Sequence, residues 1–292
     1  MAPSVPPWVE LPREITAAIL HKLGAVEILT TAQNVCTTWR RVCRDPAMWR
    51  RIHIPYSGDL ETTLHLDRMC RHAVDLSQGH LTDISIEFFG SDDLLLYISQ
   101  RSSQLRRLQL TSSPGITGGG LCEAVKNLPL LENLHLHINN SLINEKDVEN
   151  VGLSCPLKSF ALNGCWSRYY FVPNVVALAI ARSMPQLRHL QLLGNVMTNK
   201  LLEAIFYGCQ HLESLDLRKC CNVRIDGDLE RLLSQRIKDL RLPDDPLDDY
   251  PFPGVGYDEF YGIEDDDDDD DGDDDKLGSH DVDLVCDYFG SP

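Results

Sequence analysis

The sequence predicts an α/β protein with a small N-terminal helical bundle, a stack of strand–helix repeats and a disordered acidic C-terminal tail. Three observations indicate this class. A leucine motif recurs through the middle of the chain, apolar residues near the N-terminus have helical spacing, and nearly all of the excess negative charge lies after residue 243. A chain of 292 residues is long enough for one large or two modest domains.

The repeated motif is L-x-x-L-x-L, with Ile or Phe in place of Leu in some copies. Seven copies begin at intervals of 24 to 30 residues, at Leu81, Leu105, Leu131, Leu157, Leu187, Leu212 and Ile237. Helical patterns follow at residues 92–99, 120–127, 145–153, 174–184, 199–208 and 228–234. A strand and a helix in every ~25 residues is typical of a leucine-rich repeat (LRR). Residues 81–243 are therefore predicted to form an LRR solenoid, or horseshoe, with parallel strands inside and helices outside.

Cysteine and asparagine mark the turns after several predicted strands. Asn139, Cys165, Asn195 and Cys220 each stand three residues after the last Leu of a motif, where a leucine-rich repeat places Asn or Cys. The ten cysteines of the chain show no C-x-x-C spacing, and those in the repeats are interpreted as small buried packing residues. We expect neither a metal site nor any other cofactor.

Residues 8–49 are predicted to form three short helices. The first carries four apolar residues on one face, Leu11, Ile15, Ile19 and Leu23, and Gly24 suits its end. Two further helices fit residues 25–33 and 35–43. So small a bundle cannot bury all of its apolar side chains. Part of the surplus, at residues 49–54, is expected to stack on the first repeat strand near Leu81, and the remainder is interpreted as a docking face.

The same stretch carries a family resemblance. Its signature residues, in order, are Leu11-Pro12, Ile15, Ile19, Leu23, Val35-Cys36-x-x-Trp39-Arg40, Asp45 and Trp49. Over residues 8–54 they resemble an F-box, which a linker at residues 55–80, with a helical pattern near residues 64–70, would join to the repeats. The cysteine-containing repeats resemble those of plant F-box/LRR proteins.

The resemblance implies a role in ubiquitin ligation. An F-box docks to the Skp-type adaptor of an SCF ubiquitin ligase and through it to a cullin–RING ligase. The residues that would make this contact are Leu11, Pro12, Ile15, Ile19, Leu23, Val35, Trp39 and Trp49. The alternative is an LRR protein-binding scaffold that acts outside an SCF complex, with the N-terminal helices merely capping the solenoid.

Side chains between the motif leucines point away from the solenoid core, because side chains alternate along a strand. The candidate substrate-binding residues on this concave face are Arg107, Gln109, Asn133, His135, His137, His189, Gln191, Asp216 and Arg218. They are polar and mixed in sign, which favours a protein substrate over nucleic acid. The alternative is a merely solvated strand face. The three histidines lack the further ligands of a recognisable metal site.

The negative charge belongs to residues 244–292. This stretch holds 20 acidic residues and one base, Lys276, whereas the rest of the chain has 24 acidic and 26 basic residues. Repulsion in the acidic run at residues 264–271 predicts disorder, as a solvating tail or as a partner for basic surfaces. An aromatic insert at residues 166–173 is interpreted either as packing or as a contact surface.

Other function classes find little support in the sequence. No nucleophile–base pair, phosphate-binding Gly loop or metal signature stands out, so a non-catalytic protein is expected. No signal peptide and no run of 18 apolar residues is present, so we expect no membrane partner and a location in the nucleus, the cytoplasm or both. A small-molecule co-receptor role ranks below protein binding, because seven repeats are few for a closed pocket.

Overall fold

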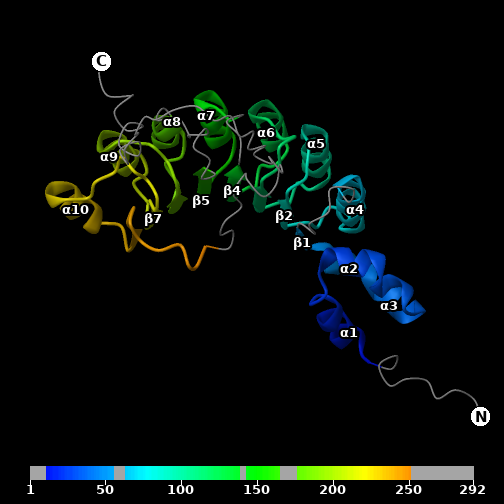
Figure 1. The fold of residues 1–292 in the computed structure, drawn as a ribbon. Coiled ribbons are helices and arrows are strands. Elements are labelled where there is room, and N and C mark those ends of the chain that lie inside the picture. The colour runs from blue at the N-terminus through cyan, green and yellow to red at the C-terminus, as the bar shows by residue number, and fades with distance from the viewer. Residues whose placement is uncertain (1–10, 56–62, 139–142, 165–175, 251–292) are drawn as a thin grey trace, which may run out of the picture.

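The computed structural model describes residues 11–55, 63–138, 143–164 and 176–250 (Figure 1). The N-terminal elements are α1 (Arg13–Leu20), α2 (Gly24–Thr30), the 3₁₀ turn η2 (Ala32–Asn34), α3 (Thr37–Cys43) and the 3₁₀ turn η3 (Pro46–Trp49). The strands are β1 (Arg51–Ile54), β2 (Asp83–Glu87), β3 (Arg107–Thr111), β4 (Asn133–Ile138), β5 (Ser159–Gly164), β6 (His189–Gln191), β7 (Ser214–Asp216) and β8 (Asp239–Arg241). The helices between them are α4 (Thr63–Leu76), α5 (Asp92–Arg101), α6 (Gly118–Val125), α7 (Glu145–Ser154), α8 (Val176–Ser183), α9 (Asn199–Gly208) and α10 (Gly227–Ser234).

The strands form one parallel sheet whose spatial order is the order in the sequence, β1 to β8. Figure 1 shows the helices α4 to α10 in a row along one side of this sheet. The central residues of the leucine motif pair across it, Ile84 with Leu108, Leu108 with Leu134 and onward. Because each motif residue meets its counterpart in the next copy, the motif residues of β2 to β7 stay on the face that the helices cover. The parallel strands and the alternation of strand and helix confirm the predicted α/β class.

The repeats are held together by one continuous hydrophobic cluster, which extends from Leu20 in α1 to Ile237 before β8. Polar caps fix the starts of α5, α6 and α7. The Thr117 hydroxyl accepts a hydrogen bond from the Gly120 N–H, and Asn144 forms a capping box at α7. Such caps satisfy backbone donors that a helix leaves open. The predicted helical ranges agree with α5 to α10 within a few residues.

The N-terminal bundle departs in detail from the predicted helices. The first helix ends at Leu20 and not at Leu23, because the chain tightens into i→i+3 hydrogen bonds from Lys22 and Leu23. Gly24 then takes a φ of +80°, which reverses the chain at little cost. The second predicted helix is split into α2 and η2, and Cys36 caps α3 instead of lying inside it.

The bundle is joined to the sheet through a strand that the leucine motif does not predict. Residues 51–54, which the resemblance places at the end of the F-box, form β1 and pair in parallel with β2, Ile52 opposite Ile84. Ile52 and Ile54 are buried. The N-terminal helices and the repeats therefore share a core. The predicted linker contains α4, which is longer than the helical pattern recognised there.

Some predictions fall outside the described residues: the disordered tail from residue 251 onward and the aromatic insert at residues 166–173. Within the described ranges no single helix has the length and apolar composition to cross a membrane. The pair formed by α1 and residues 24–34, bent by 114°, meets that test together.

Candidate functional site

An apolar groove lies on the surface of the N-terminal bundle. It has a volume of about 400 Å³ and is lined by Leu11, Thr16, Ile19, Val35 and Trp39. Leu11 and the α1 residues form one side, and Val35 and Trp39, at the start of α3, form the other. The ion pair between Arg13 and Asp45 ties the start of α1 to the turn after α3. We call this surface the N-terminal groove.

Large apolar side chains lie exposed in and beside the N-terminal groove. The exposed fractions are 49% for Ile15, 43% for Ile19, 42% for Leu23 and 52% for Val35. Pro12 is also exposed, and Leu11 and Trp39 are partly buried. Apolar side chains clustered on a surface mark an interaction site more often than scattered ones do. The structure thus brings most of the predicted adaptor-binding residues onto one accessible face.

Trp49 is the exception among the predicted adaptor-binding residues. Its side chain is 1% exposed and packs in the core between the bundle and the sheet. The indole Nε1 donates a hydrogen bond to the Cys43 carbonyl oxygen at 2.7 Å. The expectation that Trp49 contacts an adaptor is therefore wrong. The strand β1, which follows Trp49, pairs with β2 and places this residue in the core. Its role is to join the bundle to the repeats.

The second candidate surface is the concave face of the sheet. Arg107 and His189 are exposed there. Four further predicted substrate-binding residues are partly exposed, Gln109, Asn133, His135 and Gln191. The remaining three, His137, Asp216 and Arg218, are buried. For His137 the expectation of an open binding surface is wrong, because a segment beyond the last strand covers it, whereas Asp216 and Arg218 line a pocket beside that segment.

Residues 244–250 form this segment, which we call the strap. It leaves β8 and turns back across the sheet (Figure 1). The Tyr250 hydroxyl lies 2.7 Å from Nδ1 of His137, near the end of β4. The same hydroxyl accepts a hydrogen bond from Nδ2 of Asn163, a residue of β5, at 3.3 Å. The strap thus covers the carboxyl ends of β4 and β5 as well as its own neighbours.

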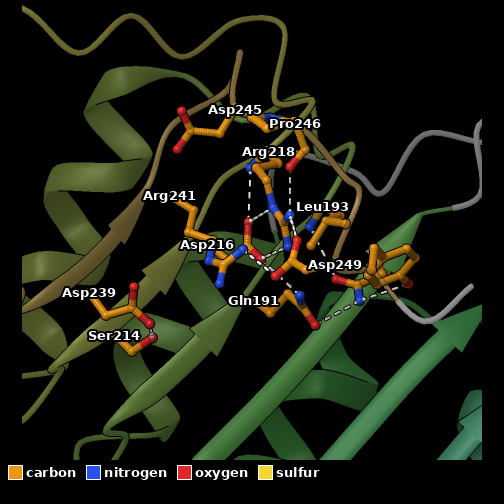
Figure 2. Close-up of polar contacts among 12 residues, drawn as sticks. Gln191, Leu193, Ser214, Asp216, Arg218, Asp239, Arg241, Asp245, Pro246 and Asp249 are labelled. Atoms are coloured by element: carbon orange, nitrogen blue, oxygen red, sulfur yellow. Dashed lines mark hydrogen bonds and ion pairs between the residues drawn. The ribbon is translucent and has the colours of Figure 1, made fainter. Parts of the chain in front are cut away.

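A chain of ion pairs holds the other end of the strap (Figure 2). Arg218 Nε donates to Asp216 Oδ1 at 3.0 Å and Arg218 Nη2 to Asp216 Oδ2 at 2.8 Å. Arg218 Nη1 donates to the Pro246 carbonyl oxygen at 2.8 Å and to the Asp249 carboxylate, which also accepts from Arg241. A buried guanidinium is tolerated only when its charge and its donors are matched, and the strap completes that match.

The buried groups of this face have shifted pKa values. Hydrogen bonds from Arg218 and Arg241 lower the pKa of Asp249 despite some desolvation, whereas the hydrogen bond to Asp216 raises the pKa of Arg218. Burial lowers the pKa of His135 to about 4 and that of His137 to about 3, with nearby positive charge adding to the effect. Both imidazoles are therefore neutral at neutral pH.

Three thiols within the repeats are packing groups. Cys155, Cys209 and Cys220 are buried, and desolvation raises the pKa of Cys209 to about 11 and that of Cys220 to about 12. Cys220 Sγ donates to the Leu192 carbonyl oxygen at 2.9 Å, inside the turn where the repeat pattern places it. In the described part of the chain, no group of three or more His, Cys, Asp or Glu side chains could hold a metal ion.

The ordered strap on the concave face is not predicted from the sequence. Its residues, Pro, Asp and Leu before Tyr250, belong to the stretch 244–292 that the sequence predicts to be an acidic, largely disordered tail. The usable signal was Arg218, a cation directly after a core leucine, which needs an acidic partner if it is buried. Nothing local identified that partner as Asp249, 31 residues further along the chain.

Comparisons with known proteins place this chain among F-box proteins. The F-box-like family pattern matches residues 8–55. The F-box protein SKIP19 of Arabidopsis thaliana is 45% identical over 260 residues, which cover 88% of this chain and 84% of that protein. The chain belongs to the F-box/LRR-repeat family. Putative F-box/LRR-repeat protein 22 of the same plant is 45% identical over 89% of this chain and 83% of its own length.

A further relative is longer than this chain. Putative F-box/LRR-repeat protein 23 of Arabidopsis thaliana is 49% identical over 247 residues, 82% of this chain, but the match covers only 54% of that protein. The chain therefore spans about half of that relative. Among solved structures, a chain in the crystal structure of the Rad7 and Elc1 complex in yeast aligns with a TM-score of 0.40 and 11% identity over 80% of this chain and 88% of that one.

Proposed function

We propose that this F-box/LRR protein is the substrate-recognition subunit of an SCF-type ubiquitin ligase. The N-terminal groove docks a Skp-type adaptor, and through it a cullin–RING ligase. The concave face of the LRR horseshoe binds the protein to be ubiquitinated. The chain itself is then non-catalytic and supplies specificity, in the nucleus, the cytoplasm or both.

One observation carries this proposal. The exposed apolar side chains Ile15, Ile19, Leu23 and Val35 lie within the segment that matches the F-box-like pattern. Completing the burial of a half-exposed aliphatic side chain contributes about 1 kcal/mol, half of the value for full burial. Several such side chains side by side provide the driving force for a stable interface.

The fusion of the bundle to the sheet supports a joint role for the two surfaces. Because β1 pairs with β2 and Trp49 fills the shared core, the N-terminal groove is fixed relative to the concave face. A substrate on the concave face is then held at a defined distance from whatever the groove binds. Such a fixed geometry raises the effective concentration of one bound partner near the other.

Co-purification with a Skp-type adaptor tests the docking. The variant Ile19→Lys with Val35→Lys places two charges in the N-terminal groove without touching the buried core. We expect a loss of adaptor affinity of about tenfold to a hundredfold, from the lost burial of two aliphatic side chains. The matched control is Leu153→Lys on α7, where an equally apolar side chain is 72% exposed outside the bundle.

The control should bind the adaptor as the unmodified chain does. Equal adaptor binding by the groove variant, with the fold retained in circular dichroism, would favour the alternative of an LRR scaffold that acts outside an SCF complex. Equal losses in the groove variant and the control would point to a nonspecific effect of surface charge.

A further inference from the structure

A pocket opens on the concave face between the last four strands and the strap. Its volume is about 250 Å³. Ser159 of β5, Gln191 of β6 and Ser214 of β7 contribute to its lining, and the strap supplies Asp249 and Tyr250. The strap, anchored on His137 and Arg218, therefore forms one wall of the pocket. We call it the strap pocket.

The size of the strap pocket limits what it can hold. Sites for drug-sized ligands have volumes of roughly 300–1,000 Å³ and bury most of the ligand. The strap pocket is smaller and open to the concave face, so a single side chain of a protein chain that crosses the strands fits it better than a free small molecule. This size argues against the co-receptor role considered from the sequence.

The charges around the strap pocket favour a cationic side chain. Three carboxylates line it, Asp216, Asp239 and Asp249, against two guanidinium groups, Arg218 and Arg241. Asp216 and Asp249 are engaged with those guanidinium groups. His135, which also lines the pocket, is neutral at neutral pH because of burial. Among the three carboxylates and two guanidinium groups, one negative charge is left over.

Asp239 carries that charge. Its side chain is exposed and accepts a hydrogen bond from the Ser214 hydroxyl at 3.2 Å. Among the described residues it has no cationic partner. Figure 2 shows Asp239 and Ser214 to one side of the network around Arg218, joined to each other and apart from it. A carboxylate has acceptor capacity for several donors, so Asp239 can receive an ammonium or guanidinium group.

We propose that the strap pocket is a specificity site that receives one Lys or Arg side chain of the substrate, whose cationic head pairs with Asp239. The proposal rests on the proposed function, because it takes the concave face as the substrate-binding surface. It adds the substrate class, a segment with a basic residue at a fixed position. An acidic side chain would approach Arg241, but that guanidinium is already paired with Asp249.

Selection from a displayed library of random peptides tests this site. The full chain is used without the adaptor, so that a failure of adaptor docking leaves the result interpretable. We expect the enriched peptides to share a Lys or Arg at one position. Asp239→Asn should weaken a selected peptide about tenfold to a hundredfold, the range expected for one hydrogen bond to a charged group.

A charge reversal separates recognition from a general effect of charge. Selection on Asp239→Lys should replace the basic residue of the enriched peptides with Asp or Glu. The matched control is Asp228→Lys on α10, which makes the same charge change at a fully exposed side chain outside the pocket. Peptides selected on this control should share the same basic residue as those selected on the unmodified chain.

Three results overturn the proposal: enriched peptides without a common basic residue, a preference that Asp239→Lys leaves unchanged, or no enrichment on a chain shown to be folded. A shift of preference in both lysine variants also overturns it, because the effect would then come from net charge and not from the pocket.

Discussion

Replacing Arg218 by Met removes the cation at the centre of the strap network and tests whether that network stabilises the fold. The Arg218 side chain is 3% exposed and that of Asp216 is 11% exposed. Methionine fills much of the same volume but leaves the Asp216 carboxylate buried without its cation. Breaking a buried ion pair in this way costs ~3–5 kcal/mol.

The structure favours the lower end of that range. Asp216 keeps two donors after the change, the Arg218 backbone N–H at 3.2 Å, which any residue at this position retains, and Gln191 Nε2 at 2.9 Å. We therefore expect the free energy of unfolding to fall by about 3 kcal/mol. Urea denaturation of the full chain, followed by circular dichroism, measures this change.

A double variant supplies the control. Arg218→Met with Asp216→Leu removes both charges, and an apolar replacement of a buried pair is often neutral or stabilising. The double variant should then be more stable than Arg218→Met alone. A loss below 1 kcal/mol for the single variant, or a double variant whose loss equals the sum of the two single losses, would refute the network as a coupled unit.

Three further predictions concern single side chains. Trp49→Ala should lower the free energy of unfolding by about 3–5 kcal/mol, and adaptor binding measured on the fraction that remains folded should be unchanged; a specific loss of binding would restore Trp49 to the docking face. Tyr250→Phe should cost about 1 kcal/mol and speed hydrogen exchange in the strap and at the ends of β4 and β5; faster exchange throughout the sheet would contradict a local role. His135→Gln should reduce the loss of stability that occurs as the pH falls from 6.5 to about 4. Over that range the histidine takes up a proton in the unfolded chain but not in the folded chain, where its pKa is lowered to about 4. Stability therefore falls as the pH falls, and the variant lacks this contribution. Equal acid sensitivity in the His135 variant, measured by urea midpoints across this range, would show that other groups control it.

The sequence predicts the alternation of strand and helix in the repeats because the physical cause of that alternation is local. A leucine motif with a period of two along each strand, repeated at ~25-residue intervals, leaves few ways to bury its side chains. The helices α5 and α7 begin where the pattern placed them, since acidic and capping residues such as Asn144 act within one turn. The apolar surplus of the first helix likewise predicted the N-terminal groove, because a bundle of that size cannot cover it.

The sequence by itself thus determined the α/β repeat, its element ranges and the family signature of the bundle. The tertiary structure alone decided which polar side chains of the concave face are open. Asp216 and Arg218 read as surface residues but are buried beside the strap, and His137 meets Tyr250 across 113 residues of chain. For Trp49 the sequence left two places open, the docking face and the contact with the first repeat strand, and the pairing of β1 with β2 decided for the core. Local patterns report the direction in which a side chain points, whereas burial depends on which distant segment packs above it.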